Sequence, residues 1–346
     1  MLFFSSIFFS PALFYGDKKP MNFVDVINIK RISSIRLSPD GNHLLFTIDK
    51  ACWKENKYIS HIWQINSNGS GLIQMTNGKN GERGGNWSPD GKYIGFVAKR
   101  SKESQIHLLN TSGGEAIEFT KHKGGIRSFQ WSPDSKKIYF IATDPLSKEE
   151  EKKKKEKDDA FIFEQNYKQR HLWKIDLASK KEERLTKGDF SILTFNILRK
   201  GGKIAFLAAP TPLYDDSIKS EIWVMDLASG TKKQITNNNM LEGWPEFSPD
   251  GKQILFAADA NEKFEGYYQS QLFTVPTKGG TPRPVIPGFK YEVYQYNWSA
   301  NGKQIFFTAN MGIHSEIFSF DLKKKKLKQL TEGQHAIYQF WYIPKI

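Results

Sequence analysis

One short phrase recurs along this chain and constrains its fold more than any other feature. The clearest copy is Trp87-Ser88-Pro89-Asp90-Gly91, and a degenerate sixth copy at residues 197–201 keeps only the spacing. The other copies begin at Leu37, Trp131, Phe247 and Trp298. Eight residues after the Ser position, every copy has a phenylalanine: Phe46, Phe96, Phe140, Phe206, Phe256 and Phe307. A phrase repeated at intervals of roughly fifty residues predicts a repeat architecture.

The phrase has the residue types of a tight turn between two strands. Proline presets φ for the second position of a turn, aspartate bonds nearby backbone, and glycine accepts the left-handed conformation that closes the turn. After the turn, Ile94 and Phe96 lie two residues apart, so both face one buried side of a strand. Each copy therefore predicts a β-hairpin, and six copies in one register make coincidence untenable.

A second phrase follows each hairpin and predicts two further strands. Its copies begin at Ser60, Ser104, Arg170, Ser220, Ser270 and Ser315, and each has Ile or Leu two residues later. Sixteen residues after these starts lie Thr76, Thr120, Thr186, Thr236, Ile286 and Thr331, with turn formers such as Asn68-Gly69 in between. Four antiparallel strands in a unit of this length are typical of a propeller blade, so the predicted fold class is an all-β propeller.

The register also sets the expected domain boundaries. The propeller is predicted over 35–346, with blades at about 35–76, 85–120, 129–186, 195–236, 246–286 and 296–331. The link from a Thr position to the next Ser position is usually twelve residues, and twelve residues after Thr331 comes Ile343, followed by Pro344. Residues 337–346 are therefore predicted to start a truncated seventh blade. The alternative is a closed six-bladed ring whose last strand is a terminal strap.

The residues before the ring divide into two parts. Residues 1–16 are predicted to be a possible signal peptide, because they are apolar and Ser10-Pro11-Ala12 offers small residues for cleavage. No basic residue follows Met1, so a misassigned start or a loose apolar tail is the alternative. Residues 17–34 are predicted to hold a short helix capped by Asn22. We expect a periplasmic or secreted protein, with a cytoplasmic one as the alternative, and no stable membrane span.

The charge of +13 raises the possibility of a nucleic-acid partner. The basic residues are 41 lysines and 9 arginines spread through turns, whereas bidentate phosphate and base recognition favours arginine. No nucleic-acid-binding motif is present, and the run Lys152–Lys155 is offset by neighbouring acidic residues. We therefore predict no nucleic-acid partner. Cys52 is the single cysteine, so no internal disulfide forms.

The sequence offers no catalytic residue, no metal ligand set and no cofactor motif that we would assign. It contains neither Gly-x-Ser-x-Gly nor His-Glu-x-x-His. His107 occupies a column filled elsewhere by Trp and Phe, which favours a packing ring over a functional one. The repeated turn carboxylates are predicted to cap turns rather than act as acids. Trp87, Trp131 and Trp298 share a column with other apolar residues and are predicted core.

The connection between the second and third strands is the variable part of the repeat, and it is longest in the third unit. Because strands alternate in direction, these connections lie on the face where the chain enters and leaves the ring, and function tends to lie on such loops. In the long insert 144–169, the charged half, 147–159, is expected to be disordered or loosely helical. The aromatic half, 160–167, is expected to dock on the ring, or else to contact a substrate or second domain.

The repeats resemble those shared by TolB and the prolyl oligopeptidase family of serine peptidases. The resemblance covers residues 18–346 and rests on the turn phrase with its Phe, the pattern Ile-Trp-x-x-Asp-Leu and the closing Leu-Thr. The opening at 18–23, Lys30-Arg31-Ile32, and the insert Asp158-Asp159-Ala160 before Arg170-His171-Leu172-Trp173 are similar to acylaminoacyl- and dipeptidyl-peptidase-like members.

This resemblance implies a function for a larger assembly. In that family a propeller covers a catalytic α/β-hydrolase domain and admits short peptides, so the resemblance implies such a domain, missing here or on a separate chain, as partner. No residue of this sequence matches the catalytic triad, so we expect a non-catalytic gating portion of a serine peptidase. The alternatives are a free-standing TolB-like periplasmic interaction propeller and, less favoured, a propeller enzyme with a site in its channel.

Overall fold

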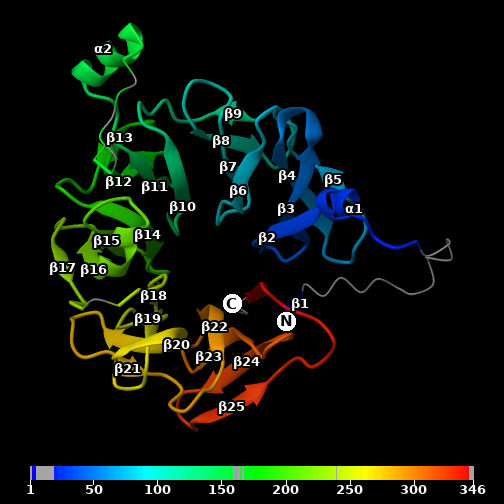
Figure 1. Ribbon diagram of the computed structural model, residues 1–346, viewed down its shortest axis with the longest axis vertical. Helices are drawn as coiled ribbons and strands as arrows, with labels where there is room; N and C mark the ends of the chain where they lie inside the picture. The colour runs from blue at the N-terminus through cyan, green and yellow to red at the C-terminus, as the bar shows by residue number, and fades with distance from the viewer. Residues whose placement is uncertain are drawn as a thin grey trace.

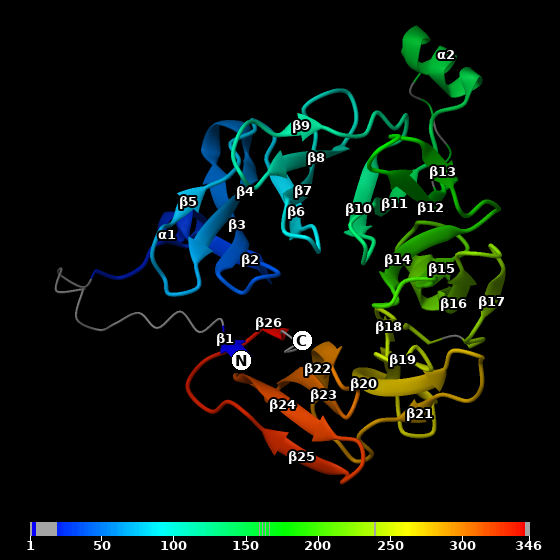
Figure 2. The same cartoon turned by 180° about the vertical axis from the view of Figure 1, so that it is seen from behind.

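The computed structural model describes residues 2–4 and 19–342, apart from positions 159, 161, 163, 166 and 239. Its strands form six four-stranded antiparallel sheets arranged around a centre, which confirms an all-β propeller with six blades (Figure 1). Figure 2 shows the same ring from behind. Most of the predicted signal segment 1–16 and the expected seventh turn at 343–345 lie outside the described residues.

In each blade the four strands follow chain order from the centre outward. Blade one consists of β2 (Arg31–Leu37), β3 (His43–Cys52), β4 (Lys57–Asn66) and β5 (Ile73–Gln74). Blade two consists of β6 (Glu82–Trp87), β7 (Tyr93–Ala98), β8 (Gln105–Asn110) and β9 (Ile117–Glu118). Blade three consists of β10 (Ile126–Trp131), β11 (Lys137–Thr143), β12 (Arg170–Asp176) and β13 (Glu182–Arg184).

The second half of the ring repeats this arrangement. Blade four consists of β14 (Ser191–Ile197), β15 (Lys203–Ala209), β16 (Glu221–Asp226) and β17 (Lys232–Gln234). Blade five consists of β18 (Glu246–Phe247), β19 (Gln253–Ala260), β20 (Gly266–Pro276) and β21 (Arg283–Pro284). Blade six consists of β22 (Glu292–Trp298), β23 (Gln304–Asn310), β24 (Ser315–Asp321) and β25 (Lys326–Gln329).

Short helices lie outside the blades. The predicted helix after Asn22 is α1 (Phe23–Asn28), whose first turn is closed by a capping box between Asn22 and Asp25. The charged half of the long insert forms α2 (Lys148–Glu156), with the remaining helical turns η2 (Trp53–Glu55) and η3 (Asp215–Lys219). α2 buries none of its residues and projects from blade three (Figure 1).

Five of the six turn phrases are held by the same three hydrogen bonds; the degenerate copy at 197–201 lacks the Ser and Asp side chains. In the second copy, the Ser88 hydroxyl donates to Asp90 Oδ1 at 2.6 Å, and Asp90 accepts the N–H of Lys92. The Ser88 oxygen in turn accepts the N–H of Tyr93 at 2.9 Å. Gly91 has a φ of +73°, which glycine adopts without steric cost. The prediction that the repeated carboxylates cap turns is confirmed.

The threonine that closes each repeat ties the outer part of the blade to its third strand. Its hydroxyl oxygen accepts a backbone N–H from that strand at 2.8–2.9 Å in the five blades that have threonine: Thr76, Thr120, Thr186, Thr236 and Thr331. The outer strand of each blade is too short to pair with this backbone N–H of the third strand. The threonine hydroxyl accepts it instead, so the buried donor is satisfied.

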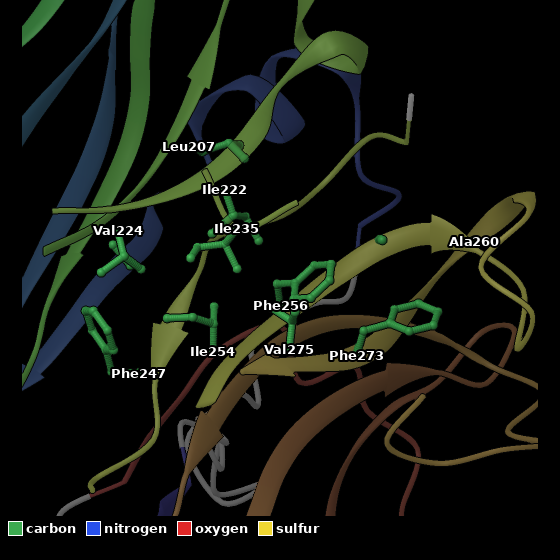
Figure 3. Packing of buried hydrophobic residues seen from close by; sticks show 12 residues of the cluster. Leu207, Ile222, Val224, Ile235, Phe247, Ile254, Phe256, Ala260, Phe273 and Val275 are labelled. Atoms are coloured by element: carbon green, nitrogen blue, oxygen red, sulfur yellow. The ribbon is translucent and has the colours of Figure 1, made fainter. Parts of the chain in front are cut away.

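Blades pack face to face through the predicted phenylalanine column. Five members are at most 1% exposed: Phe96, Phe140, Phe206, Phe256 and Phe307. Figure 3 shows one interface, where Leu207 and Val224 of blade four face Ile254 and Phe256 of blade five. Each buried phenylalanine contributes about 1.5–3 kcal/mol through burial. Phe46 is only half-buried, because its side of blade one faces a position where no complete blade stands.

That position, between blades six and one, holds a two-stranded sheet. β26 (Phe340–Tyr342) pairs antiparallel with β1 (Leu2–Phe4), and both lie beside the open end of the ring (Figure 1). Phe340 exchanges two hydrogen bonds with the Gln295 side chain of blade six. The N–H of Ser34 in blade one donates to the Gln339 side chain. The segment ending in β26 therefore bridges the first and last blades.

Candidate functional site

The best candidate for a site is the inner rim of the ring at the ends where the inner strands begin, and we call this rim the channel mouth. The start of β10, the end of β11 and the start of β12 lie side by side, because Ile126 pairs with Ala142 and Thr143 pairs with Arg170. The insert 144–169 leaves the blade at this end, as the sequence predicts. We call this side of the ring the loop face.

A β-bulge recurs near the start of the inner strands. The register shifts between Arg83 and Asn86 in β6 and between Ile126 and Ser128 in β10. Equivalent shifts occur in β2, β14 and β22. A bulge interrupts the strict alternation of side chains and changes the direction in which the side chain beside it points. The residues at the channel mouth are therefore presented differently from those further along the same strands.

Three arginines gather at this mouth in blades two and three, and we call Arg83, Arg127 and Arg170 the arginine arc. Arg83 and Arg127 are exposed and occupy the same register position, five residues before Ser88 and Ser132. The Arg83 guanidinium donates to the carbonyl of Ile126 at 3.0 Å, which places it next to Arg127. Burial, and then the positive charge of Arg127, lower the pKa of both Arg83 and Arg170.

Aromatic residues lie near the starts of the inner strands in blade five, in blade six and before β26, and we call Trp244, Tyr294 and Tyr338 the aromatic arc; of these, Tyr294 shares the register position of Arg127 in a complete blade. Trp244 is 75% exposed and Tyr338 is 69% exposed. Tyr294 donates its hydroxyl to Glu292 at 2.9 Å. β18, β22 and β26 lie across the centre from β6 and β10 (Figure 2). The three arginines and the exposed aromatic residues thus belong to different blades of the ring.

The residues that the sequence singled out lie in the core, away from this mouth. His107 is 1% exposed and stacks on Phe96 with ring centroids 5.5 Å apart. Its Nδ1–H donates to the carbonyl of Gln105 at 3.2 Å, which confirms the packing interpretation. Trp87, Trp131 and Trp298 are buried, as their column predicts.

One array in blade three has the elements of a nucleophile and a base. His171 lies 3.2 Å from the Thr186 hydroxyl and 3.6 Å from Asp144. Burial, followed by the charge of Arg184, lowers the pKa of His171 to about 4, so the ring is neutral near pH 7. Both His171 and Thr186 are at most 1% exposed, and Thr186 already accepts the N–H of Leu172. The array is structural, because no substrate can reach the hydroxyl.

The described residues provide no metal centre: no three His, Cys, Asp or Glu side chains among them converge as ligands. Neither described α-helix combines the length and apolar composition needed to cross a bilayer. The expected docking of the aromatic half of the insert stays a prediction, because positions 161, 163 and 166 lie outside the described part of the chain.

Comparison with known proteins identifies the class of this propeller. A family model described as the TolB beta propeller domain matches residues 211–337. Dipeptidyl-peptidase 5 of Porphyromonas gingivalis is 28% identical over 340 residues, which cover 91% of this chain and 50% of that protein. The chain thus spans about half the length of the curated relatives it matches.

Solved structures share the fold. Acylaminoacyl peptidase of Pyrococcus horikoshii matches with a TM-score of 0.63 at 17% identity, covering 89% of this chain and 47% of that one. The β-propeller domain of the trilobed protease from Pyrococcus furiosus matches with a TM-score of 0.60 at 18% identity, covering 89% and 87%. The chain is a β-propeller with TolB-type repeats. Together the matches fit the N-terminal propeller of the prolyl oligopeptidase family, as the resemblance implied.

The arginine arc was missed in the sequence, although a signal for it is present. Arg83 and Arg127 are separated by the same interval as Ser88 and Ser132, so they share a repeat column. The column shows no common residue type in the other blades, and only the folded ring brings Arg170 beside it.

Proposed function

We propose that this chain is the non-catalytic propeller portion of a prolyl-oligopeptidase-family serine peptidase. It would control the access of short peptides to a catalytic α/β-hydrolase domain that the given sequence does not contain. The observation that carries this proposal is the match to dipeptidyl-peptidase 5, which covers 91% of this chain but only 50% of the relative.

The shape of the ring supports a gating role. The inner strands bring polar and aromatic side chains to a mouth on the loop face, the face from which the insert 144–169 projects. Under this proposal an extended peptide would pass between such side chains, whereas a folded domain would be excluded. Buried polar groups such as His171 and Thr186 have structural partners, so chemistry is assigned to another domain.

A second candidate is a free-standing TolB-like propeller that binds other proteins in the periplasm. The match of residues 211–337 to the TolB beta propeller domain favours it. Under either proposal we place the protein in the periplasm or outside the cell, on the apolar character of residues 1–16. Cell fractionation tests this placement, and recovery in the cytoplasm would contradict it.

Sequencing of the gene and its transcript beyond the codon for Ile346 tests the main proposal. We expect a reading frame, continuous or adjacent, that encodes Gly-x-Ser-x-Gly in an α/β-hydrolase domain. In the assembled protein, loosening the ring with Trp341→Ala should increase cleavage of long peptides relative to dipeptide substrates. A stop codon followed by unrelated genes, together with copurification of an envelope protein, would favour the TolB-like alternative instead.

A further inference from the structure

We propose that the arginine arc binds the carboxylate of a peptide at the mouth of the channel. The ligand class is a peptide with an acidic side chain or a free C-terminal carboxylate. This inference rests on the proposed gating function, because it names the chemical class of peptide that the gate would retain.

The first argument is the geometry of Arg83. Its guanidinium is fixed by donation to the carbonyl of Ile126, which belongs to the next blade. Only one of the five N–H donors of an arginine is used in this contact. The remaining N–H donors are held near the channel mouth with no ion pair to a carboxylate of the described residues, and such a preorganised group binds an anion at a lower entropic cost.

The second argument is that the Arg127 side chain has no bonding partner among the described residues. Within the described residues its side chain makes no hydrogen bond or ion pair, although it is exposed beside the bulge of β10. Arg170 begins β12 on the same side of the blade, and its side chain also has no acidic partner in the described part of the chain. Two guanidinium groups therefore add charge to the one that Arg83 presents.

The neighbouring carboxylate does not neutralise the arc. Glu82 precedes Arg83, but its side chain points into the blade and is engaged by His61 at 2.9 Å and by the N–H of Gly78 at 2.8 Å. Arg100 also reaches Glu82, at 3.5 Å. The charge of Glu82 is thus already balanced. A second carboxylate, Glu103, has its Oε2 3.6 Å from the position that a Cβ would take at Gly125, and this single charge still leaves the three arginines in excess.

The chemistry of these groups selects a carboxylate. A guanidinium binds carboxylates bidentately through two parallel N–H donors, and such charge-assisted bonds are stronger than neutral ones. Trp244 and Tyr338 also expose aromatic rings, on which apolar side chains can pack. The carboxylate is therefore the group that the proposal assigns to the arginine arc.

Binding can be measured on the present chain without any catalytic domain. Protein labelled with ¹⁵N-arginine is titrated with acetyl-Ala-Ala-Phe, and its side-chain N–H signals are followed by NMR. The amidated peptide acetyl-Ala-Ala-Phe-amide lacks the carboxylate, whereas acetyl-Ala-Glu-Phe-amide carries it on a side chain. Comparison of the free-acid peptide with the glutamate peptide shows whether the protein binds a C-terminal or a side-chain carboxylate.

We expect the free-acid peptide or the glutamate peptide, and not the neutral amide, to shift a small set of arginine signals. Arg127→Ala should weaken this binding about tenfold, and 0.5 M salt should weaken it further. Arg283→Ala is the matched control, because Arg283 is an exposed arginine in β21 of blade five, at the outer edge of the ring. This variant should stay within about twofold of the parent affinity.

Three results would overturn the inference. The first is equal binding of the acidic and amidated peptides, and the second is an unchanged affinity in Arg127→Ala. The third is tighter binding of a single-stranded oligonucleotide with the same dependence on Arg127. A gene that encodes no catalytic domain would refute the gating function, but it would not change the result of the peptide titration. The two proposals can therefore fail independently.

Discussion

The guanidinium of Arg36 lies 4.5 Å from the centre of the Trp341 ring, and this contact joins the first blade to the final described strand. Arg36 is anchored by donation to the carbonyl of Ile35 at 2.8 Å, and burial lowers its pKa. Together with the hydrogen bonds from Gln295 to Phe340, it holds β26 between blades six and one. The contact is therefore part of the closure of the ring.

Replacing the tryptophan tests this role. Trp341→Ala should lower the free energy of unfolding by about 1–2 kcal/mol, because it removes a partly desolvated cation–π contact and some apolar burial. Urea denaturation measures the loss. Trp341→Phe keeps an aromatic face and should lose less. Identical midpoints for all three proteins would show that β26 does not contribute to stability.

The buried carboxyl of Glu246 predicts a dependence of stability on pH. Burial raises the pKa of Glu246 to about 8, and its Oε2 has no hydrogen-bond partner among the described residues. An unfolded glutamate has a pKa of about 4.3. Between these values the unfolded chain releases a proton that the folded chain keeps. The contribution of Glu246 to the free energy of unfolding should therefore be greatest below about pH 4. It should decrease as the pH rises towards 8.

Glu246→Gln separates this effect from other titrations. Glutamine stays neutral, so the variant should exceed the parent in stability at pH 8, by on the order of 5 kcal/mol, and match it near pH 4. Glu242, whose pKa burial also raises to about 8, would leave some slope in the variant. Thermal melts from pH 4 to pH 8 provide the measurement. Parallel curves for the two proteins would contradict the prediction.

The phenylalanine column allows a matched comparison within one chain. Phe256→Ala should cost about 3–5 kcal/mol, because a fully buried ring leaves a cavity between blades. Phe46→Ala should cost about half as much or less, because Phe46 is half-buried where no complete neighbouring blade covers it. Chemical denaturation of both variants tests the difference. Equal losses would mean that the face of blade one is covered in solution.

The turn phrase predicts which substitutions its carboxylate tolerates. Asp134 accepts hydrogen bonds from the Ser132 hydroxyl and the N–H of Lys136. Asp134→Ala should cost about 1 kcal/mol, whereas Asp134→Asn should be nearly neutral, since Asn301 makes the same bonds in the copy of blade six. Denaturation at pH 7 tests the pair, and a larger cost for the Asn variant would contradict the prediction.

The same turn predicts acid sensitivity. The Ser132 hydroxyl lowers the pKa of Asp134, so this carboxylate stabilises the fold above the pKa of the unfolded side chain and loses that contribution as pH falls below it. Asp134→Asn should therefore reduce the loss of stability on acidification. A steeper loss in the variant would exclude this assignment.

The open face of blade one predicts self-association. Ile32 is 44% exposed, whereas Ile126, at the same register position in blade three, is fully buried against blade two. An exposed strand face of this kind promotes association. We expect concentration-dependent sedimentation of the isolated chain, reduced by Ile32→Lys. The matched variant Thr194→Lys, in β14, should leave association unchanged. A monomer at every concentration would indicate that the two-stranded sheet already protects this face.

The repeat was predictable because every copy has the same local chemistry. Ser88, Asp90 and Gly91 specify a turn by their own hydrogen bonds and φ, and Phe96 has the same neighbours as its counterparts. These are short-range properties that one stretch of sequence contains. The buried state of His107 was predictable for the same reason, since its column defines its surroundings.

The channel mouth was not predictable in this way. The bulge at Arg127 adds a residue to one strand only, so the period-two pattern does not reveal which way the side chain faces. Arg170 comes forty-three residues later in the sequence and reaches the arc only through pairing with Thr143. The partial exposure of Phe46 likewise depends on what stands at the seventh position, which no local motif encodes.

The two-stranded sheet has a mechanical consequence for the whole circumference. Elsewhere neighbouring blades pack across larger apolar clusters, whereas the segment ending in β26 packs on blade six through the small cluster Phe306, Ile317, Ile337 and Phe340. On the side of blade one, the printed contacts of the described residues are the Arg36–Trp341 contact and the bond from Ser34 to Gln339. Any opening of the ring should therefore begin on the blade-one side of β26.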